Sequence, residues 1–273
     1  LLLLTPKGLV PRWIAVLILL FMLRLPGTNT GQSVGLRLTF FDVGQGLSVM
    51  IKTRNSLTLY DTGPTFGSRF SAAKQIVVPS IRQLGHHRLD RVIISHSDND
   101  HAGGLDEIIS TFDIGDSYLE PSDCEASWTS DDIRFRLFNV EHEAQNTNNS
   151  SCLMLIDTGA HRILLTGDIE AQAELAVSKL QLPWLTLMSA PHHGSDTSST
   201  PPLLNATLPN IVVVSSGYMN RFSHPSPEVL RRYKNRALRV YNTAKDGAVE
   251  VTFLGQEIKI RTARVARPAI WRR

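Results

Sequence analysis

Four side chains of the kinds that bind metal ions lie within six consecutive residues of this chain. They are His96, Asp98, Asp100 and His101, in the sequence His-Ser-Asp-Asn-Asp-His-Ala-Gly-Gly. The cluster follows an apolar stretch typical of a buried strand and precedes a segment with helical spacing. Two carboxylates and two imidazoles that face one point would repel each other and lose solvation unless a cation lay among them. We therefore predict a metal site at this turn between a strand and a helix.

Further residues of the same types follow three later strands that the sequence predicts. Asp168 follows one of them after a Gly, the pair His192-His193 follows the next, and His224 follows a third after a loop. Each is weak evidence alone, since a single Asp at a strand end is more often a turn residue. Together these segments bring five of the nine histidines of the chain to strand ends, as a composite metal site requires.

The elements that must position these residues are predicted from hydrophobic spacing. Strands are expected at 36–42, 48–52 and 56–61, which form an antiparallel meander, and at 91–95, 133–140, 152–156, 161–166, 185–189, 211–214, 239–241, 249–253 and 257–261. Helices are expected at 72–84, from within 106–111, at 170–180 and at 227–236. Strands interrupted by single helices favour one α/β domain of packed sheets covered by helices.

Length, composition and motifs exclude several classes of protein. The 273 residues are 42% hydrophobic and 19% charged, which excludes a disordered, collagen-like or coiled-coil chain and suffices for a sizeable core. A nucleophile elbow, a P-loop and a dinucleotide fingerprint are all missing from the sequence. We therefore set aside a serine hydrolase, an NTPase and a dehydrogenase.

The chain has only two cysteines, Cys124 and Cys152. A disulfide framework is therefore not expected to organise the fold. Cys152 lies in a predicted buried strand, so we expect a free thiol in the core rather than a bridge. On this basis the cysteines do not indicate a redox compartment.

The first residues differ in character from the rest. Residues 13–23 form an uninterrupted apolar run between Arg12 and Arg24, and the chain begins with four leucines instead of Met. At 1.5 Å per residue this run spans roughly 16 Å, short of the ~30 Å hydrocarbon core, although the flanking arginines could snorkel. We expect a membrane-associated segment in a fragment of a longer protein, with a buried helix as the alternative.

The net charge of +3 conceals an asymmetry along the chain. Before Arg231 there are 16 Lys and Arg against 22 Asp and Glu, and from Arg231 onward there are 12 against 3. A basic tail on a slightly acidic body fits a polyanionic partner or, equally, a solvated tail. The candidate DNA-binding residues are Arg231, Arg232, Lys234, Arg236 and Arg239.

The metal-binding cluster resembles the His-x-His-x-Asp-His signature of the metallo-β-lactamase superfamily, with Asp98 in place of the second His. Further segments resemble, more narrowly, the C-terminal soluble domain of the ComEC family, the membrane channel proteins of bacterial DNA uptake. The matches extend from about Leu36 to about Arg236. Besides the cluster, the matching segments are Phe41-Asp-Val-Gly-Gln-Gly46, Leu164-Leu-Thr-Gly-Asp-Ile169, Pro191-His-His-Gly-Ser195 and Ser223-His-Pro-Ser226.

The resemblance implies an α/β fold, an αββα sandwich of the metallo-β-lactamase type, with the metal site on loops at one edge of two packed sheets. It implies that residues 1–26 end a transmembrane channel region, that 27–35 form a linker, and that 36–273 form the metallo-β-lactamase-like domain with its basic stretch. It also implies a bacterial inner membrane protein whose soluble domain is periplasmic. DNA, its own channel domain in the membrane and other competence proteins are the implied partners.

Metal-binding roles follow from the resemblance, position by position. His96 and Asp98 would bind one divalent ion, Asp100 and His101 would bind a second, and Asp168 would bridge the two. Asp98 shifts the ligand set toward oxygen, so Mn²⁺ and Zn²⁺ are both candidates. Either one ion or two would be held.

The remaining ligands are left open. His193 or His192 would complete the second position, the other lying near the scissile group, and His224 would be a ligand or a phosphate contact. Enzymes of this fold usually supply a third His to the first metal from the loop that is 141–150 here. That loop is rich in Asn, so the first position is weak unless His142 contributes.

These residue types suit phosphodiester hydrolysis by metal-activated water. Asp100 and Asp168 would hold or orient the nucleophile, and His192 or His193 would stabilise charge or protonate the leaving oxygen. With the resemblance, they predict a metal-dependent nuclease that degrades the strand not imported during DNA uptake. The alternatives are a non-catalytic DNA-binding module with a degenerate metal site, and a small-substrate phosphodiesterase such as a phosphorylcholine esterase.

Overall fold

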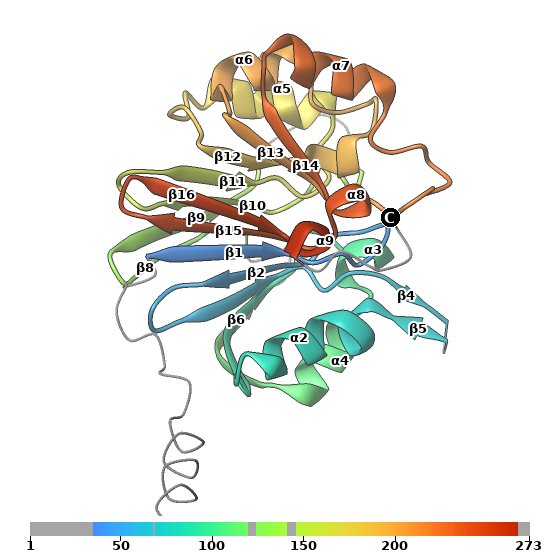
Figure 1. Ribbon diagram of the computed structural model, residues 1–273. Coiled ribbons are helices and arrows are strands. Elements are labelled where there is room, and N and C mark those ends of the chain that lie inside the picture. The colour runs from blue at the N-terminus through green and yellow to red at the C-terminus, as the bar shows by residue number, and fades with distance from the viewer. Residues whose placement is uncertain (1–34, 68, 120–123, 141–145, 267–273) are drawn as a thin grey trace, which may run out of the picture. The chain divides into compact units, whose positions relative to one another are not determined.

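Two seven-stranded β-sheets pack face to face in the computed structural model of the chain (Figure 1). The structure describes residues 35–67, 69–119, 124–140 and 146–266. The first sheet has the order β16-β15-β1-β2-β3-β6-β7. The first three strands along the chain form the predicted antiparallel meander, and β3, β6 and β7 run parallel. The strand bounds are β1 Leu36–Phe40, β2 Val49–Lys52, β3 Leu57–Tyr60, β6 Arg88–Ile93, β7 Asp113–Leu119, β15 Val249–Leu254 and β16 Glu257–Thr262.

The second sheet has the order β14-β13-β12-β11-β10-β9-β8. Its bounds are β8 Ala126–Ser130, β9 Ile133–Phe138, β10 Leu153–Asp157, β11 Arg162–Leu165, β12 Leu187–Ser189, β13 Ile211–Val214 and β14 Arg239–Asn242. Strands β11 to β14 are parallel. The sequence of β13, Ile-Val-Val-Val, is buried throughout, as expected for a parallel strand covered on both faces.

Helices cover the outer faces of both sheets (Figure 1). A π-helical turn at Ala73–Val77, α2 (Val78–Gln83) and α4 (Leu105–Thr111) lie against the first sheet. The second sheet is covered by α5 (Ala171–Lys179), α6 (Pro201–Thr207) and α7 (Pro227–Asn235). Shorter elements are α3 (Asn99–Ala102), a 3-10 turn at Pro191–Gly194, α8 (Thr243–Asp246), α9 (Ala263–Ala266) and the hairpin of β4 (Thr65–Phe66) and β5 (Phe70–Ser71).

Three apolar layers hold this arrangement together. The middle layer joins the sheets, with Phe40 and Val251 from the first and Met154 and Leu165 from the second, all fully buried. The outer layers lie between each sheet and its helices. Burial of apolar surface is the main favourable term in folding. Strands with apolar side chains on both faces therefore hold each sheet between the other sheet and a layer of helices. The αββα architecture predicted from the resemblance is thus confirmed.

Several elements differ from the prediction. The helix expected at 72–84 divides into the π-helical turn and α2, and the helix expected from within 106–111 begins at Leu105. Strands β7 and β8 and helix α6 were not predicted. The sequence of β7 contains two Asp and a Gly, and α6 begins with two prolines, so neither shows a plain hydrophobic period.

The expectation of a free core thiol is wrong, because Cys124 and Cys152 form a disulfide. Both side chains are buried in the layer between the sheets. Because β8 and β10 each pair antiparallel with β9, they run in the same direction, and each cysteine precedes one of them. The two residues therefore meet at one end of the sheet, which strand prediction alone does not reveal.

The predictions for residues 1–26 and for most of the linker at 27–35 fall outside the described residues, as does His142. In the part of the chain that the structure does describe, none of the helices has the length and apolar character needed to cross a membrane.

Candidate metal centre

The predicted site residues lie on loops that follow four strands. His96 to His101 follow β6 and enter α3, Asp168 follows β11, and the His192-His193 turn follows β12. Because β11, β12 and β13 are parallel, the loops at their carboxyl ends meet at one edge of the second sheet. The long connection after β13, which carries His224, reaches the same edge, where the ring of His224 lies against that of His192.

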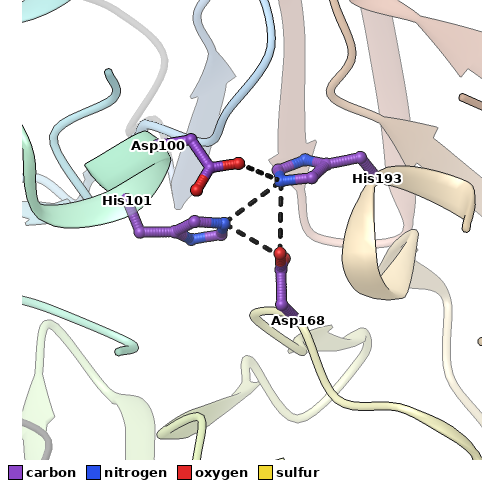
Figure 2. A group of neighbouring side chains, drawn as sticks. All are labelled: Asp100, His101, Asp168 and His193. Carbon is purple, nitrogen blue, oxygen red and sulfur yellow. Dashed lines mark hydrogen bonds and ion pairs between the residues drawn. The ribbon is translucent and has the colours of Figure 1, made fainter. Parts of the chain in front are cut away.

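Four of these residues form a compact group, here called the Asp/His cluster and drawn in Figure 2: Asp100, His101, Asp168 and His193. One ligand atom from each lies within 4.8 Å of those of the others. Nε2 of His101 is 3.1 Å from Asp168 Oδ1 and 3.2 Å from His193 Nε2. Nε2 of His193 is 3.2 Å from Asp100 Oδ2 and 3.3 Å from Asp168 Oδ2. Two ligands about 2.1 Å from a tetrahedral ion lie about 3.4 Å apart, so these separations fit a shared cation.

The imidazole of His101 is held from behind by Asp61. Oδ2 of Asp61 lies 2.7 Å from Nδ1 of His101, and both side chains are fully buried. Asp61 also accepts hydrogen bonds from the backbone N–H and the hydroxyl of Ser95. This contact directs Nε2 of His101 toward the cluster, as carboxylates behind metal-binding histidines do. Asp61 was not among the predicted site residues, although it too ends a predicted strand.

His193 is oriented by the backbone. Its Nδ1 lies 2.8 Å from the carbonyl oxygen of Ser215, which can only accept, so Nδ1 donates and Nε2 faces the cluster. His192 and His193 both have positive φ, 47° and 54°. Such conformations cost about 1 kcal/mol or more in a non-glycine residue and collect at functional sites. The turn therefore directs consecutive imidazoles to the edge of the sheet.

His96 and Asp98 lie beside the cluster. Nε2 of His96 is 3.8 Å from Asp98 Oδ2 and 4.0 Å from Asp168 Oδ2. This nitrogen is buried and has no hydrogen-bond partner among the described residues. A buried polar atom without a partner is costly, and a cation between it and the two carboxylates would remove that cost. The residues present therefore fit a second ion position next to the first.

Attraction between the carboxylates and the imidazoles determines the pKa values in the cluster. Burial opposes charge on Asp168 and His193, but each stabilises the charged form of the other. The pKa of Asp168 is therefore well below its usual value. Burial alone would lower the pKa of His193, but Asp168 and Asp100 outweigh this effect and raise it to about 9. Burial likewise disfavours charge on Asp100, yet His193 and His101 bring its pKa to about 2. Without a metal, the pKa values place a protonated His193 beside the ionised carboxylates of Asp100 and Asp168 at pH 7.

His96 behaves in the opposite way. Burial and the nearby charge of His101 lower its pKa to about 4. His96 is therefore neutral at pH 7, the state in which an imidazole binds a metal.

His192 and His224 lie at the margin of the cluster. Nε2 of His192 is 3.9 Å from Asp168 Oδ2, and its Nδ1 is 3.3 Å from Glu170, which was not among the predicted site residues. The ring of His224 meets that of His192 edge to face, with centroids 5.7 Å apart. Burial, together with the charges of His193 and His192, lowers the pKa of His224 to about 4.

Of the predicted DNA-binding residues, three lie on α7, Arg236 directly follows it, and Arg239 lies on β14. Arg231 and Arg232 pair with Glu228, and Arg232 also donates to the carbonyl oxygen of Ser198 at 2.8 Å. Arg236 donates to Asn205 at 2.9 Å. Three of the five thus have partners within the protein, which a count of charges along the sequence does not show.

The fold and the Asp/His cluster together define a metallo-β-lactamase domain. Residues 41–141 match the family model described as the metallo-beta-lactamase superfamily. Among solved structures, the fold is similar to that of Tm1679, a metal-dependent hydrolase of the beta-lactamase superfamily, with a TM-score of 0.50 and 14% sequence identity over 80% of this chain and 100% of that one. Members of this superfamily are typically metal-dependent hydrolases.

Curated relatives narrow the class further. The chain is 32% identical to Competence protein ComA of Neisseria gonorrhoeae, over 97% of this chain and 39% of that protein. It is 32% identical to Recombination protein 2 of Haemophilus influenzae, over 82% of this chain and 29% of that protein. It is 24% identical to ComE operon protein 3 of Bacillus subtilis, over 78% of this chain and 32% of that protein. The chain therefore contains a metallo-beta-lactamase domain homologous to competence proteins of the ComEC family, and it spans 29–39% of the length of these relatives.

Proposed function

We propose that this domain is a metal-dependent phosphodiesterase that hydrolyses the DNA strand not imported during DNA uptake. One observation carries the proposal: in the Asp/His cluster the ligand atoms in contact are 3.1–3.3 Å apart, beside a buried nitrogen of His96 that has no hydrogen-bond partner in the described part of the chain. Such an arrangement of imidazoles and carboxylates suits Zn²⁺ or Mn²⁺. Homology to competence proteins supports DNA as the substrate.

The Asp/His cluster would hold one divalent ion, and His96 with Asp98 would hold a second, with Asp168 between the two positions. A divalent ion bound here supplies Lewis-acid activation of water and of the phosphoryl group. Asp61 keeps His101 in place, and the backbone of Ser215 does the same for His193.

We assign the proton transfer and the phosphate contact to His192 and His224, at the margin of the cluster. His192 is partly exposed and lies next to Glu170, so we assign to its imidazole the delivery of a proton to the leaving oxygen. His224 lies outside the cluster, and its buried Nδ1 has no hydrogen-bond partner among the described residues. We assign His224 to a contact with the substrate phosphate rather than to metal binding.

The disulfide supports an extracytoplasmic position for the domain, because such bonds persist in oxidising compartments and are rare in the cytosol. We propose that the domain is periplasmic, attached to a channel domain in the bacterial inner membrane, and that other competence proteins are its partners. This position would let it meet incoming DNA at the membrane.

The proposal is tested by incubating the purified chain with labelled single- and double-stranded DNA in the presence of Mn²⁺, Zn²⁺ or a chelator. Cleavage should require metal and should fall by at least about tenfold in Asp100→Asn, since the loss of a ligand should cost at least as much as the loss of a residue behind one. Asp106→Asn, at an exposed carboxylate on α4, is the matched control and should retain activity.

Two other results would replace the proposal with one of its alternatives. Cleavage of chromogenic phosphodiesters without cleavage of DNA would identify a small-substrate phosphodiesterase. Binding of DNA that weakens steeply with salt, without metal-dependent cleavage, would identify a binding module.

A further inference from the structure

Residues 217–223, between β13 and α7, form a loop that exposes three large apolar side chains. Tyr218 is 74% exposed, Met219 is 86% exposed and Phe222 is 50% exposed. The guanidinium of Arg221 lies over the ring of Phe222, 4.6 Å from its centroid. Figure 1 shows this connection as an orange loop that projects from the sandwich on the side where α3 lies. Large apolar groups gathered at a surface often mark a binding site.

The loop is held in this conformation by the side chain of Asn220. Its amide donates to the carbonyl oxygens of Gly217 and His224, and its oxygen accepts from the backbone N–H groups of Phe222 and His224. Met219 and Ser223 have positive φ, which costs free energy in residues other than glycine. The exposure of the aromatic rings is therefore a property of a fixed loop.

The same loop is connected to the candidate metal centre. The ring of Phe222 stacks on that of His224, with centroids 5.6 Å apart. His224 in turn lies edge-on to His192, whose Nε2 is 3.9 Å from Asp168. A nucleic-acid strand with one phosphate near His192 would thus place its neighbouring nucleotides close to Phe222.

We propose that the 217–223 loop binds unstacked bases of single-stranded DNA and so selects single strands for the metal centre. This inference rests on the proposed function, which supplies DNA as the substrate. Exposed aromatic faces stack with bases of any sequence, and Arg221 adds a positive charge for the backbone and a cation over the ring. A duplex keeps its bases paired and stacked inside, so the loop would engage it through charge alone.

The test measures binding to the chelator-treated chain, so that cleavage does not interfere. The two probes are a thymidine 12-mer and an abasic 12-mer with the same number of phosphates. Wild type should bind the thymidine oligonucleotide at least about fivefold more tightly, the lower end of the effect of one stacked base. The Tyr218→Ala/Phe222→Ala variant should bind both with similar Kd.

Trp184→Ala is the matched control. Trp184 is also an exposed aromatic with an arginine, Arg162, over its ring, but it precedes β12 and thus lies at the opposite end of that strand from the His192-His193 turn. This variant should keep the preference for thymidine. Tyr218→Ala alone should weaken the preference without changing the thermal midpoint, because that side chain is largely exposed.

Equal binding of the two probes by wild type, or a preference that survives in the double variant, would overturn the inference. The proposed function fails separately: if wild type cleaves no DNA with Mn²⁺ or Zn²⁺ but prefers the thymidine probe through Tyr218 and Phe222, the loop assignment holds and the hydrolase assignment does not.

Discussion

At the scale of single residues, the site depends on what lies behind each imidazole. His101 and His193 both have Nδ1 bound by the protein, through Asp61 and the carbonyl of Ser215, so Nε2 of each faces the same point. A ligand that is already oriented loses less conformational freedom when an ion binds. The residues behind the ligands should therefore matter to metal affinity almost as much as the ligands do.

Replacing Asp61 by Asn should weaken metal binding by about 10- to 100-fold, because the neutral amide holds His101 less firmly and makes it a weaker base. Titration calorimetry with Zn²⁺ or Mn²⁺ measures the change, and circular dichroism checks the fold. Asp106→Asn, which alters an exposed carboxylate, should bind like wild type. If Asp61→Asn bound metal as tightly as wild type, the buried pair with His101 would have a purely structural role.

The raised pKa values of His193, about 9, and of His101 predict how metal affinity depends on pH. Below pH 9 the metal-free protein carries a proton on His193 that a metal must displace, so affinity should rise with pH and fall as pH decreases. Over pH 6.5 to 8.5, log Kd should decrease by about one to two per pH unit, with one to two protons released on binding. Calorimetry in buffers of different ionisation enthalpy counts those protons, and a pH-independent Kd would contradict the prediction.

At the scale of elements, the loop that follows β1 connects the two sides of the site. The backbone N–H of Leu47 donates to the carbonyl oxygen of Asp100, and the carbonyl oxygen of Gly46 accepts from the hydroxyl of Ser215. Gly46 has φ of 140°, and a Cβ there would overlap the Asp100 carbonyl oxygen. The close contact between the backbones of Gly46 and Asp100 leaves no room for a side chain, which explains why residue 46 is a glycine.

Gly46→Ala should displace Asp100 and lower metal affinity by at least about tenfold, the effect expected when the support of a ligand is disturbed. Gly44→Ala is the matched control from the same loop. Gly44 also has positive φ, but a Cβ there would meet open space, so the cost is limited to about 1 kcal/mol of backbone strain without a change at the site. Equal metal affinities in the two variants would show that the close approach to Asp100 is not important for the site.

How far the sequence predicts this molecule depends on the range of each interaction. The His96 to His101 segment is one local turn after a strand, and its clustered charges are visible in sequence. Asp61 was missed because its partner, His101, is 40 residues away and only the parallel pairing of β3 with β6 brings their strand ends together. The disulfide was missed for the same reason. Local chemistry could be predicted, whereas contacts that need the sheet order could not.

At the scale of the whole molecule, the disulfide reinforces the sheet that carries Asp168 and His193. It closes a loop of 28 residues that contains β8 and β9, and Cys152 immediately precedes β10. The backbone N–H of Cys152 donates to the carbonyl oxygen of Ser95, next to His96. The bond thus connects the edge strand β8 of the second sheet to the segment that bears the proposed metal-binding turn.

Reducing this disulfide should destabilise the domain, because the unfolded chain regains the entropy of a 28-residue loop. The chain-entropy model gives about 3.5 kcal/mol for such a loop, which corresponds to a fall of about 10 °C in thermal midpoint for a domain of this size. Melting curves with and without reductant measure it, and thiol titration of unfolded protein should find no free thiol before reduction and two afterwards. A Cys124→Ser/Cys152→Ser variant should melt at the lower temperature under both conditions. If reductant left the wild-type midpoint unchanged while both thiols became free, the bond would not stabilise the fold.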